Sequence, residues 1–566
     1  MAYRMFTRRP PGIKLPMLLA AGLGVCPWQP GRRTAILASI TAQAPSGPAM
    51  PTPGGCMQRP FSPVLALVIL LLLPLAPGLP LTPDGPGAAL AAQEQEEDVQ
   101  PARWASEHSM SLNGETVDYE AVVGSVILRD DAEDPIGELY YTAYFRSNGE
   151  DGATRPIVFS YNGGPGSASF WLHMGIMGPR RIQTPTIGPQ GAPPYPLVDN
   201  QHTLLDVADI VMVDPIGTGF SKPLGETPGN VFWGIDEDAR SLTQFVRRFL
   251  SQHGRWNSPR YLLGESYGTT RSAVLARHLQ GANIDLNGII LVSSVLDFQT
   301  IQFAPQTIVA YVTNVPAYAL VAAYHDALPG GAPADSVAFL AEVEEWAITD
   351  YASALLAGST IDPAARTRVI DQMHGYTGLS REYLDRADLR VTAAEFRQEL
   401  LRDRGLQVGR LDARFTGPIG EPLDRTPTHD VQSSAISSAY TTAFNAYLRD
   451  ELGYDGDMEY TPSGGTGGWN WQRGGGGRGE TPNVTPDLAE AMLRNPDLEV
   501  LLINGTYDLA TPYFAAVWSM DQLGLPPELR AQIQRSDFPA GHMMYVDESL
   551  LDQWRDVLVE FIQRTR

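Results

Sequence analysis

The sequence is poor in cysteine. Its 566 residues contain two, Cys26 and Cys56, and both lie near the N-terminus. Positive charge is also scarce, because 41 Lys and Arg stand against 64 Asp and Glu, and the formal net charge is -23. This balance argues against non-specific binding of nucleic acid. No metal site or cofactor is expected, since the sequence has no His-Glu-x-x-His motif and its nine histidines are scattered.

An uncharged apolar run near the N-terminus is too short to span a membrane comfortably. From Met57 the sequence reads "MQRPFSPVLALVILLLLPLAPGLP", with the run over Val64–Leu73. The following "GAALAAQ" offers a small-x-small cleavage site at Ala89 and Ala91. This order predicts a secretory signal peptide that begins at Met57, with a transmembrane anchor as the alternative.

A competing interpretation takes the upstream "FTRRPPGIKLPMLLAAGLGVC" as a twin-arginine or lipoprotein signal, although the residues before Cys26 fit lipidation poorly. In either case residues 1–92 are a targeting region. We expect an exported protein, periplasmic or extracellular, with membrane anchoring as the alternative. After cleavage near Ala91 the chain has no cysteine, so its stability must come from its core without disulfides.

The rest of the chain has the composition and pattern of an α/β protein, with 43% hydrophobic residues. "DYEAVVGSVILRD" and "IGELYYTAYFRS" predict an antiparallel hairpin. Short buried strands such as "PIVFSYNGG" and "GIILVSS" then alternate with amphipathic helices over Ile235–Leu250 and Thr269–Leu279. This alternation predicts a mostly parallel sheet with helices on both faces.

Strand patterns disappear from about Ile301 and return with "LEVLLINGTYD". We therefore expect a core over 93–300 and 431–566, interrupted by a helical insertion over 301–430. The glycine-rich tract Ser463–Gly479 predicts a flexible loop, and its Trp469 and Trp471 offer the alternative that it borders a site.

"YLLGESYGTT" places Ser266 between Gly264 and Gly268. Gly-x-Ser-x-Gly is a weak pattern by itself. Here a short apolar strand precedes the serine and a helical pattern follows it, which is the arrangement that presents a nucleophilic serine at the carboxyl edge of a sheet. Ser266 is therefore the candidate nucleophile.

A serine nucleophile needs a base and an acid that orients the base. Asp508 follows the strand in "LLINGTYDLATPY", and His542 lies in the later loop "FPAGHMMYVDES". The order Ser, Asp, His is the one found on such sheets. An oxyanion hole needs two backbone N–H groups, for which Tyr267 and the loop with Gly163 and Gly164 are the candidates.

Five segments together resemble the serine carboxypeptidase family, which has the α/β-hydrolase fold. They are "NGGPGSAS", "VDPIGTGFS", "GESYG", "YDLATPY" and "GHMMY", and they span Asn162–Tyr545 in the family's order. The lack of disulfides resembles a bacterial exported branch of this family.

The resemblance implies roles for these residues. Ser266, Asp508 and His542 would form the triad, and Gly164 and Tyr267 would supply the oxyanion amides. Asn162 and Glu265 would bind the terminal carboxylate of a substrate. A glutamate can donate to a carboxylate only when it is protonated, because two close negative charges are costly.

One position departs from the family pattern. Better-known members have a second glutamate two residues before the Gly-Pro of "WLHMGIMGPRR", where this chain has Ile176. We therefore consider Arg180, Arg181 or Arg271 as an alternative carboxylate ligand, with activity nearer neutral pH, against the alternative that these arginines form surface ion pairs.

The expected function is an exported serine-type carboxypeptidase that acts on peptides with a free C-terminus through an acyl-enzyme. An acyltransferase or esterase of the same fold is one alternative. A non-catalytic binding protein of the hydrolase fold is another, but such proteins typically lose the serine or the histidine, and this chain has both.

Overall fold

The computed structural model describes residues 99–149, 151–184, 187–464, 467–473 and 480–566. All of these residues belong to one compact unit, Glu94–Arg566. The predicted signal peptide and both cysteines lie outside the described residues. Within the described part of the chain, no helix is both long and apolar enough to cross a membrane.

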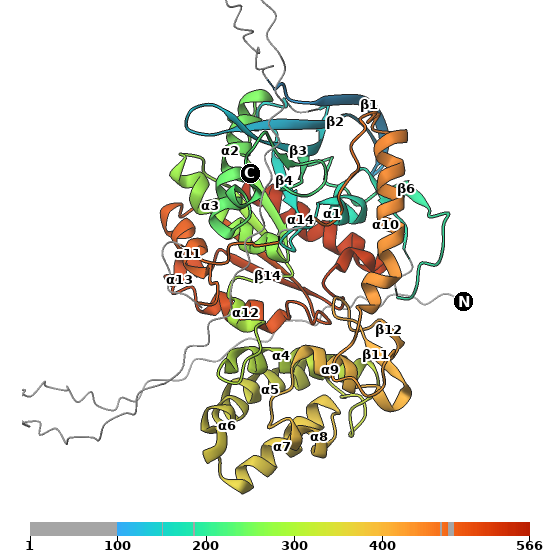
Figure 1. The fold of residues 1–566 in the computed structure, drawn as a ribbon, viewed down its shortest axis with the longest axis vertical. Helices are drawn as coiled ribbons and strands as arrows, with labels where there is room; N and C mark the ends of the chain where they lie inside the picture. The colour runs from blue at the N-terminus through green and yellow to red at the C-terminus, as the bar shows by residue number, and fades with distance from the viewer. Residues whose placement is uncertain (1–98, 150, 185–186, 465–466, 474–479) are drawn as a thin grey trace, which may run out of the picture. The chain divides into compact units, whose positions relative to one another are not determined.

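One mixed sheet of ten strands organises this unit (Figure 1). Its strands are β1 (Arg103–Leu112), β2 (Glu115–Arg129), β3 (Pro135–Arg146), β4 (Ile157–Tyr161), β7 (Asp209–Val213), β8 (Lys222–Pro223), β9 (Arg260–Glu265), β10 (Gly288–Val292), β13 (Glu499–Gly505) and β14 (Ile533–Phe538). The spatial order is β1-β2-β3-β7-β4-β9-β10-β13-β14, with β8 beside β3. The predicted hairpin is confirmed as β2 and β3.

The strands from β7 to β14 in this order run parallel, whereas β1, β2, β3 and β7 pair antiparallel. Parallel strands buried on both faces are expected to be continuously apolar. β4, β7 and β10 are indeed buried along their whole length. Their carboxyl ends lie at one edge of the sheet, where the candidate site residues follow.

Helices cover both faces of the sheet. α10 (Val431–Asp450) and α14 (Leu551–Thr565) pack with strand residues such as Val158 and Ile290. α2, α3 and α11 pack with Phe159 and Ile289, which are next to Val158 and Ile290 in the sequence. Successive residues of a strand point to opposite faces, so these three helices cover the other face of the sheet. These three helices are α2 (Ile235–Gln252), α3 (Tyr267–Gly281) and α11 (Thr485–Arg494).

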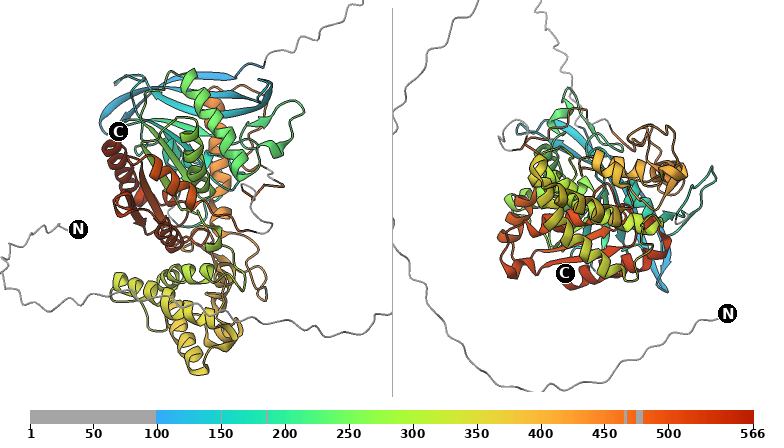
Figure 2. Two further views of the ribbon diagram at one scale, coloured as in Figure 1. Left: turned by 90° about the vertical axis from the view of Figure 1, so that its left-hand side faces the viewer. Right: turned by 90° about the horizontal axis from the view of Figure 1, so that it is seen from below.

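A helical block follows β10, and its helices gather in one group in Figures 1 and 2. They are α4 (Ile308–Tyr324), α5 (Ser336–Trp346), α6 (Ala352–Ala357), α7 (Pro363–Thr377), α8 (Arg381–Arg386) and α9 (Ala393–Glu399). Side chains of Asp335, Asp362, Ser380 and Thr392 cap the starts of α5, α7, α8 and α9. Two short antiparallel strands, β11 (Leu406–Val408) and β12 (Thr416–Pro418), come next.

The block has an apolar core that also includes residues from beyond β13. Leu509, Tyr513 and Phe514 belong to this core, and the last two lie in α12 (Tyr513–Asp521). The helical block therefore packs on the segment that directly follows Asp508. The remaining short elements are α1 (Phe170–Leu172), α13 (Pro527–Arg530) and the antiparallel pair β5 (Arg180–Ile182) and β6 (Leu197–Asp199).

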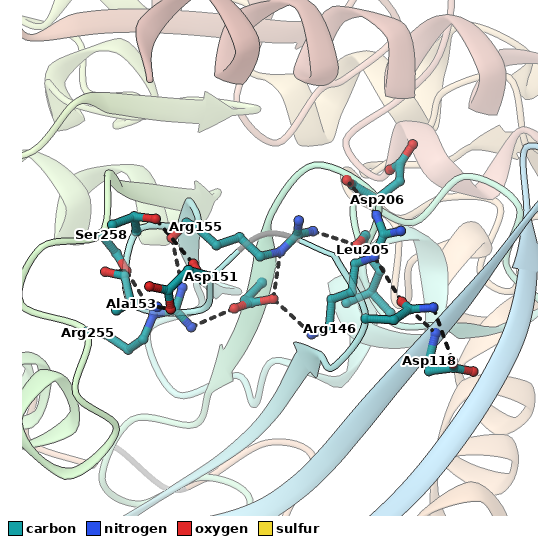
Figure 3. Close-up of polar contacts among 12 residues, drawn as sticks. Asp118, Arg146, Asp151, Ala153, Arg155, Leu205, Asp206, Arg255 and Ser258 are labelled. Atoms are coloured by element: carbon teal, nitrogen blue, oxygen red, sulfur yellow. Dashed lines mark hydrogen bonds and ion pairs between the residues drawn. The ribbon is translucent and has the colours of Figure 1, made fainter.

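The amino-terminal edge of the sheet contains a buried charge cluster, whose contacts can be followed in Figure 3. Asp209, the first residue of β7, accepts hydrogen bonds from Arg155 at 3.0 Å and from Arg255 at 2.5 Å. All three residues are buried. Because buried charges are stable only when paired, this carboxylate holds two loops against the end of the sheet opposite the candidate site.

Candidate active site

Ser266 lies on a tight turn between a strand and a helix. β9 ends at Glu265 and α3 begins at Tyr267, and Ser266 between them has φ 61° and ψ -127°. A positive φ is uncommon outside glycine and clusters at functional sites. A Cβ atom on Gly264 would lie 2.1 Å from the carbonyl oxygen of Gly268, so the turn has no room for a side chain there. This is the strand-turn-helix geometry that the sequence predicts for Ser266.

Asp508 and His542 form a buried pair. Nδ1 of His542 lies 2.7 Å from Oδ2 of Asp508. The Asp508 carboxylate also accepts hydrogen bonds from the backbone N–H groups of Ala510 and Thr511, and the Thr511 hydroxyl lies 2.8 Å from Oδ2. These contacts fix the carboxylate and therefore the imidazole that it orients.

The serine turn and the histidine loop are both hydrogen-bonded to residues at the end of β10. The backbone N–H of Ser266 donates to the carbonyl oxygen of Val292, the last residue of β10. The hydroxyl of Ser293, the next residue, donates to the carbonyl oxygen of His542 at 2.7 Å. The structure thus brings the serine turn and the Asp508–His542 pair to one edge of the sheet.

The charges around His542 favour its protonated form. Burial lowers the pKa of its imidazole, whereas the nearby Asp508 and, to a smaller extent, Glu265 raise it. The effect of the carboxylates is the larger one, so the pKa lies above its ordinary value. An imidazole stabilised in this way accepts a proton readily, as a general base must.

The glycine-rich loop after β4 packs against the start of α3. A Cβ atom on Gly163 would lie 2.4 Å from the backbone nitrogen of Tyr267, and Gly164 has φ 107°. Gly163 is required by the close approach, and Gly164 by its backbone conformation. The loop therefore lies next to the amide that follows Ser266, where an oxyanion hole is expected.

Asn162 and Glu265 are in contact. The Asn162 side-chain amide donates to Oε1 of Glu265 at 2.7 Å, and both residues are buried. Burial raises the pKa of Glu265 to about 7, against the opposing influence of His542, Tyr545 and Asn162. Glu265 therefore keeps its proton at pH values well above those at which an exposed glutamate loses its proton.

The three arginines considered as carboxylate ligands are engaged elsewhere. Their ion pairs are Arg180 with Asp199 and Glu451, Arg181 with Glu548, and Arg271 with Asp238. Arg271 is fully buried between the rings of Tyr161 and Tyr267, and it donates to the backbone carbonyl of Asn162 at 2.7 Å. Each guanidinium thus pairs with a carboxylate of the chain, as the ion-pair alternative expects, although Arg271 is buried and not on the surface.

Ile176 lies in the apolar core within a short π-helical turn, His173–Met177, and is 1% exposed. The neighbouring Gly175 packs against the ring of Tyr545, since a Cβ atom there would lie 2.2 Å from a ring carbon. An aromatic side chain from the histidine loop therefore fills the space beside the position of the missing glutamate.

The segment after β11 holds both triad loops through its backbone. The carbonyl oxygen of Arg410 accepts from the N–H of Leu509, next to Asp508. The carbonyl oxygen of Leu411 accepts from the N–H of His542 at 2.6 Å. This link joins the helical block directly to the loops that carry the acid and the base.

Side chains of the same segment strengthen the link. Arg414 forms ion pairs with Asp412 at 2.7 Å and with Asp547 at 2.8 Å, and it donates to the carbonyl oxygen of Pro539. Asp412 in turn accepts from the N–H of Gly541. The sequence alone does not identify Asp412, Arg414 or Asp547, because the segments that they join lie more than 100 residues apart. Thr511 lies within "YDLATPY", but its hydrogen bond to Asp508 is visible only in the structure.

The described part of the glycine-rich tract borders the serine turn. The rings of Trp469 and Trp471 meet the ring of Tyr267 edge to face, with centroid distances of 5.4 and 5.9 Å. Of the two interpretations of this tract, its described residues fit the one in which it borders a site. In the described residues, no group of three or more His, Cys, Asp or Glu side chains could hold a metal ion.

A sequence model of the serine carboxypeptidase family matches residues 120–315. The matched segment contains Asn162, Gly164 and the Ser266 turn, and it ends before Asp508 and His542. No curated protein matches the chain. The family match confirms the resemblance to serine carboxypeptidases over this segment.

Two solved structures are similar to this chain at low sequence identity. The prohormone-processing carboxypeptidase Kex1 of Saccharomyces cerevisiae is 16% identical, with 79% of this chain and 91% of that chain covered and a TM-score of 0.48. The proline iminopeptidase of Mycobacterium smegmatis is 14% identical, with 81% and 98% covered and a TM-score of 0.34. The parallel strands, the helices on both faces and the serine turn after β9 confirm the predicted α/β-hydrolase fold.

Proposed function

We propose that this serine carboxypeptidase removes amino acids from the C-terminus of peptides through an acyl-enzyme formed on Ser266. The observation that supports the proposal most directly is the buried Asp508–His542 pair at 2.7 Å, which lies at the same sheet edge as the strained serine turn. A serine, an imidazole and a carboxylate in this order can perform acyl transfer without a cofactor.

In the first half of the reaction, the Ser266 hydroxyl attacks the carbonyl carbon of the last peptide bond while His542 takes the hydroxyl proton. Asp508 stabilises the resulting imidazolium. The backbone N–H groups of Gly164 and Tyr267 donate to the developing oxyanion. His542 then passes the proton to the leaving amine, the C–N bond breaks, and the last amino acid departs.

In the second half, water attacks the ester carbon while His542 takes a proton from it. Collapse of this second oxyanion intermediate breaks the bond to Ser266, and the proton returns to the serine oxygen. The shortened peptide leaves with a new carboxyl group, and the enzyme is regenerated.

The restriction to C-termini is assigned to Asn162 and Glu265. An amide donor and a protonated carboxylic acid can both donate to the terminal carboxylate of a substrate. The raised pKa of Glu265, about 7, supports this role because the acid stays protonated up to neutral pH. A peptide amide or an internal peptide bond has no such carboxylate and would be held less well.

The helical block over 301–430 is proposed to cap the site and to shape the pocket for the substrate residue before the cleaved bond. Its apolar core includes Leu509, next to Asp508. Its final segment accepts the backbone hydrogen bond of His542 through Leu411. We further propose that the protein is exported, on the basis of the leader pattern that begins at Met57.

Release of an amino acid from a blocked dipeptide and from its C-terminal amide tests the proposed function. The purified protein should cleave the free acid in clear preference to the amide, and Ser266→Ala should cleave neither. Equal cleavage of both would agree with Ser266 as the nucleophile but refute the carboxylate site. That result is expected for an esterase or acyltransferase. A folded protein that cleaves neither would support the binding-protein alternative.

A further inference from the structure

Two buried polar atoms next to the serine turn have no hydrogen-bond partner among the described residues. They are the hydroxyl oxygen of Tyr545 and Oε2 of Glu265. Both residues are at least 96% buried. A buried polar atom without a partner is costly, and in a folded protein it commonly marks a place where a ligand completes the hydrogen bonding.

Tyr545 lies three residues after His542, in the short 3-10 turn Met544–Val546. Its hydroxyl lies close enough to Glu265 and Asn162 for each to influence its pKa, although neither contact has the geometry of a hydrogen bond. The phenol therefore shares its surroundings with the two residues assigned to the substrate carboxylate.

The backbone opposite Tyr545 is shaped to receive its ring. The Cβ position of Gly175 lies 2.2 Å from a ring carbon, so any side chain at residue 175 would displace the ring. Residue 176, where a second carboxyl group would stand in the family pattern, is the buried Ile176. The tyrosine ring that bears this hydroxyl thus lies beside the segment that lacks the expected acid.

A phenol differs from a carboxylic acid in one respect that matters here. A glutamate can donate to a carboxylate only when it is protonated, and its ionised form would repel the negative charge of the substrate. Burial raises the pKa of Tyr545 well above its ordinary value, so its hydroxyl keeps its proton throughout the neutral range. It can therefore donate a hydrogen bond at any working pH.

We propose that Tyr545 is a specificity-determining residue whose hydroxyl donates to the terminal carboxylate of the substrate, together with Asn162 and Glu265, in place of a second acid. This inference rests on the proposed function. It explains why the hydroxyl is buried next to Glu265 without a hydrogen bond to any residue that the structure describes, and why the chain tolerates Ile176.

Tyr545→Phe tests the proposal, because it removes only the hydroxyl and leaves the ring against Gly175. A hydrogen bond to a charged group contributes enough that its loss should raise KM for a blocked dipeptide acid by about tenfold or more. The kcat value for that acid, and kcat/KM for the corresponding amide, should change by less than about twofold. The unfolding temperature should not fall, since the lost hydroxyl makes no hydrogen bond to any of the described residues in the free protein.

Tyr351→Phe is the matched control. Tyr351 is also buried, but its hydroxyl donates to the carbonyl oxygen of Leu389 at 2.6 Å within the helical block. This control should lower the unfolding temperature and leave the preference for the acid unchanged. The pair of variants separates loss of a structural hydrogen bond from loss of substrate recognition.

Three results would overturn the role of Tyr545. They are an unchanged preference for the acid in Tyr545→Phe, an equal loss for acid and amide, and a variant that fails to fold, which would show that the hydroxyl is structural. A different result would refute the proposed function instead, namely a wild-type protein that shows no preference for the acid.

Discussion

Protonation of Glu265 should control how tightly the enzyme binds a substrate with a terminal carboxylate. Its pKa is raised from an ordinary value of 4.5 to about 7, mainly by burial. If the protonated acid holds the substrate carboxylate, then KM for peptide acids should be constant below pH 7 and rise by about tenfold per pH unit above it. Glu265→Gln, which donates at every pH, should remove this alkaline rise.

The same shift predicts a change in stability. Between pH 4.5 and 7 the folded protein retains a proton on Glu265 that the unfolded chain has released, so the free energy of unfolding falls as pH rises through this interval. A shift of this size corresponds to about 3 kcal/mol. Above pH 7 both states have lost the proton, and the difference is constant.

Urea unfolding of the wild-type protein and Glu265→Gln at pH 4.5 and pH 8 measures this effect. Relative to the wild-type protein, the free energy of unfolding of Glu265→Gln should be about 3 kcal/mol higher at pH 8 than at pH 4.5. The kinetic measurement compares KM for an acid and an amide from pH 5 to pH 9. A KM for the acid that stays flat to pH 9, or a stability difference that does not depend on pH, would refute the reasoning about Glu265.

Other variants test the remaining parts of the site. Asp508→Asn should keep the fold but lower kcat by about 10⁴, measured by amino-acid release, because the imidazole loses the carboxylate that orients it. Gly163→Ala should lower kcat by about 100-fold or more, since its Cβ atom would collide with the amide of Tyr267 in the oxyanion hole. Arg414→Met should reduce both kcat and stability, the latter by about 3–5 kcal/mol, because it leaves buried carboxylates uncompensated beside the histidine loop. Asp209→Ala should cost a similar 3–5 kcal/mol in urea unfolding but leave kcat unchanged below the unfolding transition, since it lies at the opposite edge of the sheet; a fall in kcat there would contradict the separation of the two edges.

Motifs with a local geometry could be predicted from the sequence. The turn at Ser266 is specified by glycines two residues away on either side and by the strand and helix patterns next to it. Asp508 and His542 could be placed at the same edge because each follows a strand of a parallel sheet. The fold class follows from the same alternation of strands and helices.

Pairings between distant segments could not be predicted. Arg271 looks like a surface residue of a helix, but the structure buries it between two tyrosine rings where it serves Asp238. The contact of Asp412 with the histidine loop joins positions 129 residues apart. Such contacts depend on how the elements pack, and periodicity within one element carries no information about them.

Trapping the acyl-enzyme tests the central claim most directly. The purified protein would be mixed with an activated ester of a blocked amino acid, quenched with acid during turnover and analysed by peptide mass spectrometry. One acyl group is expected on the peptide that contains Ser266, and none in Ser266→Ala. Release of product without an adduct on Ser266, or an adduct on another residue that persists in Ser266→Ala, would contradict it.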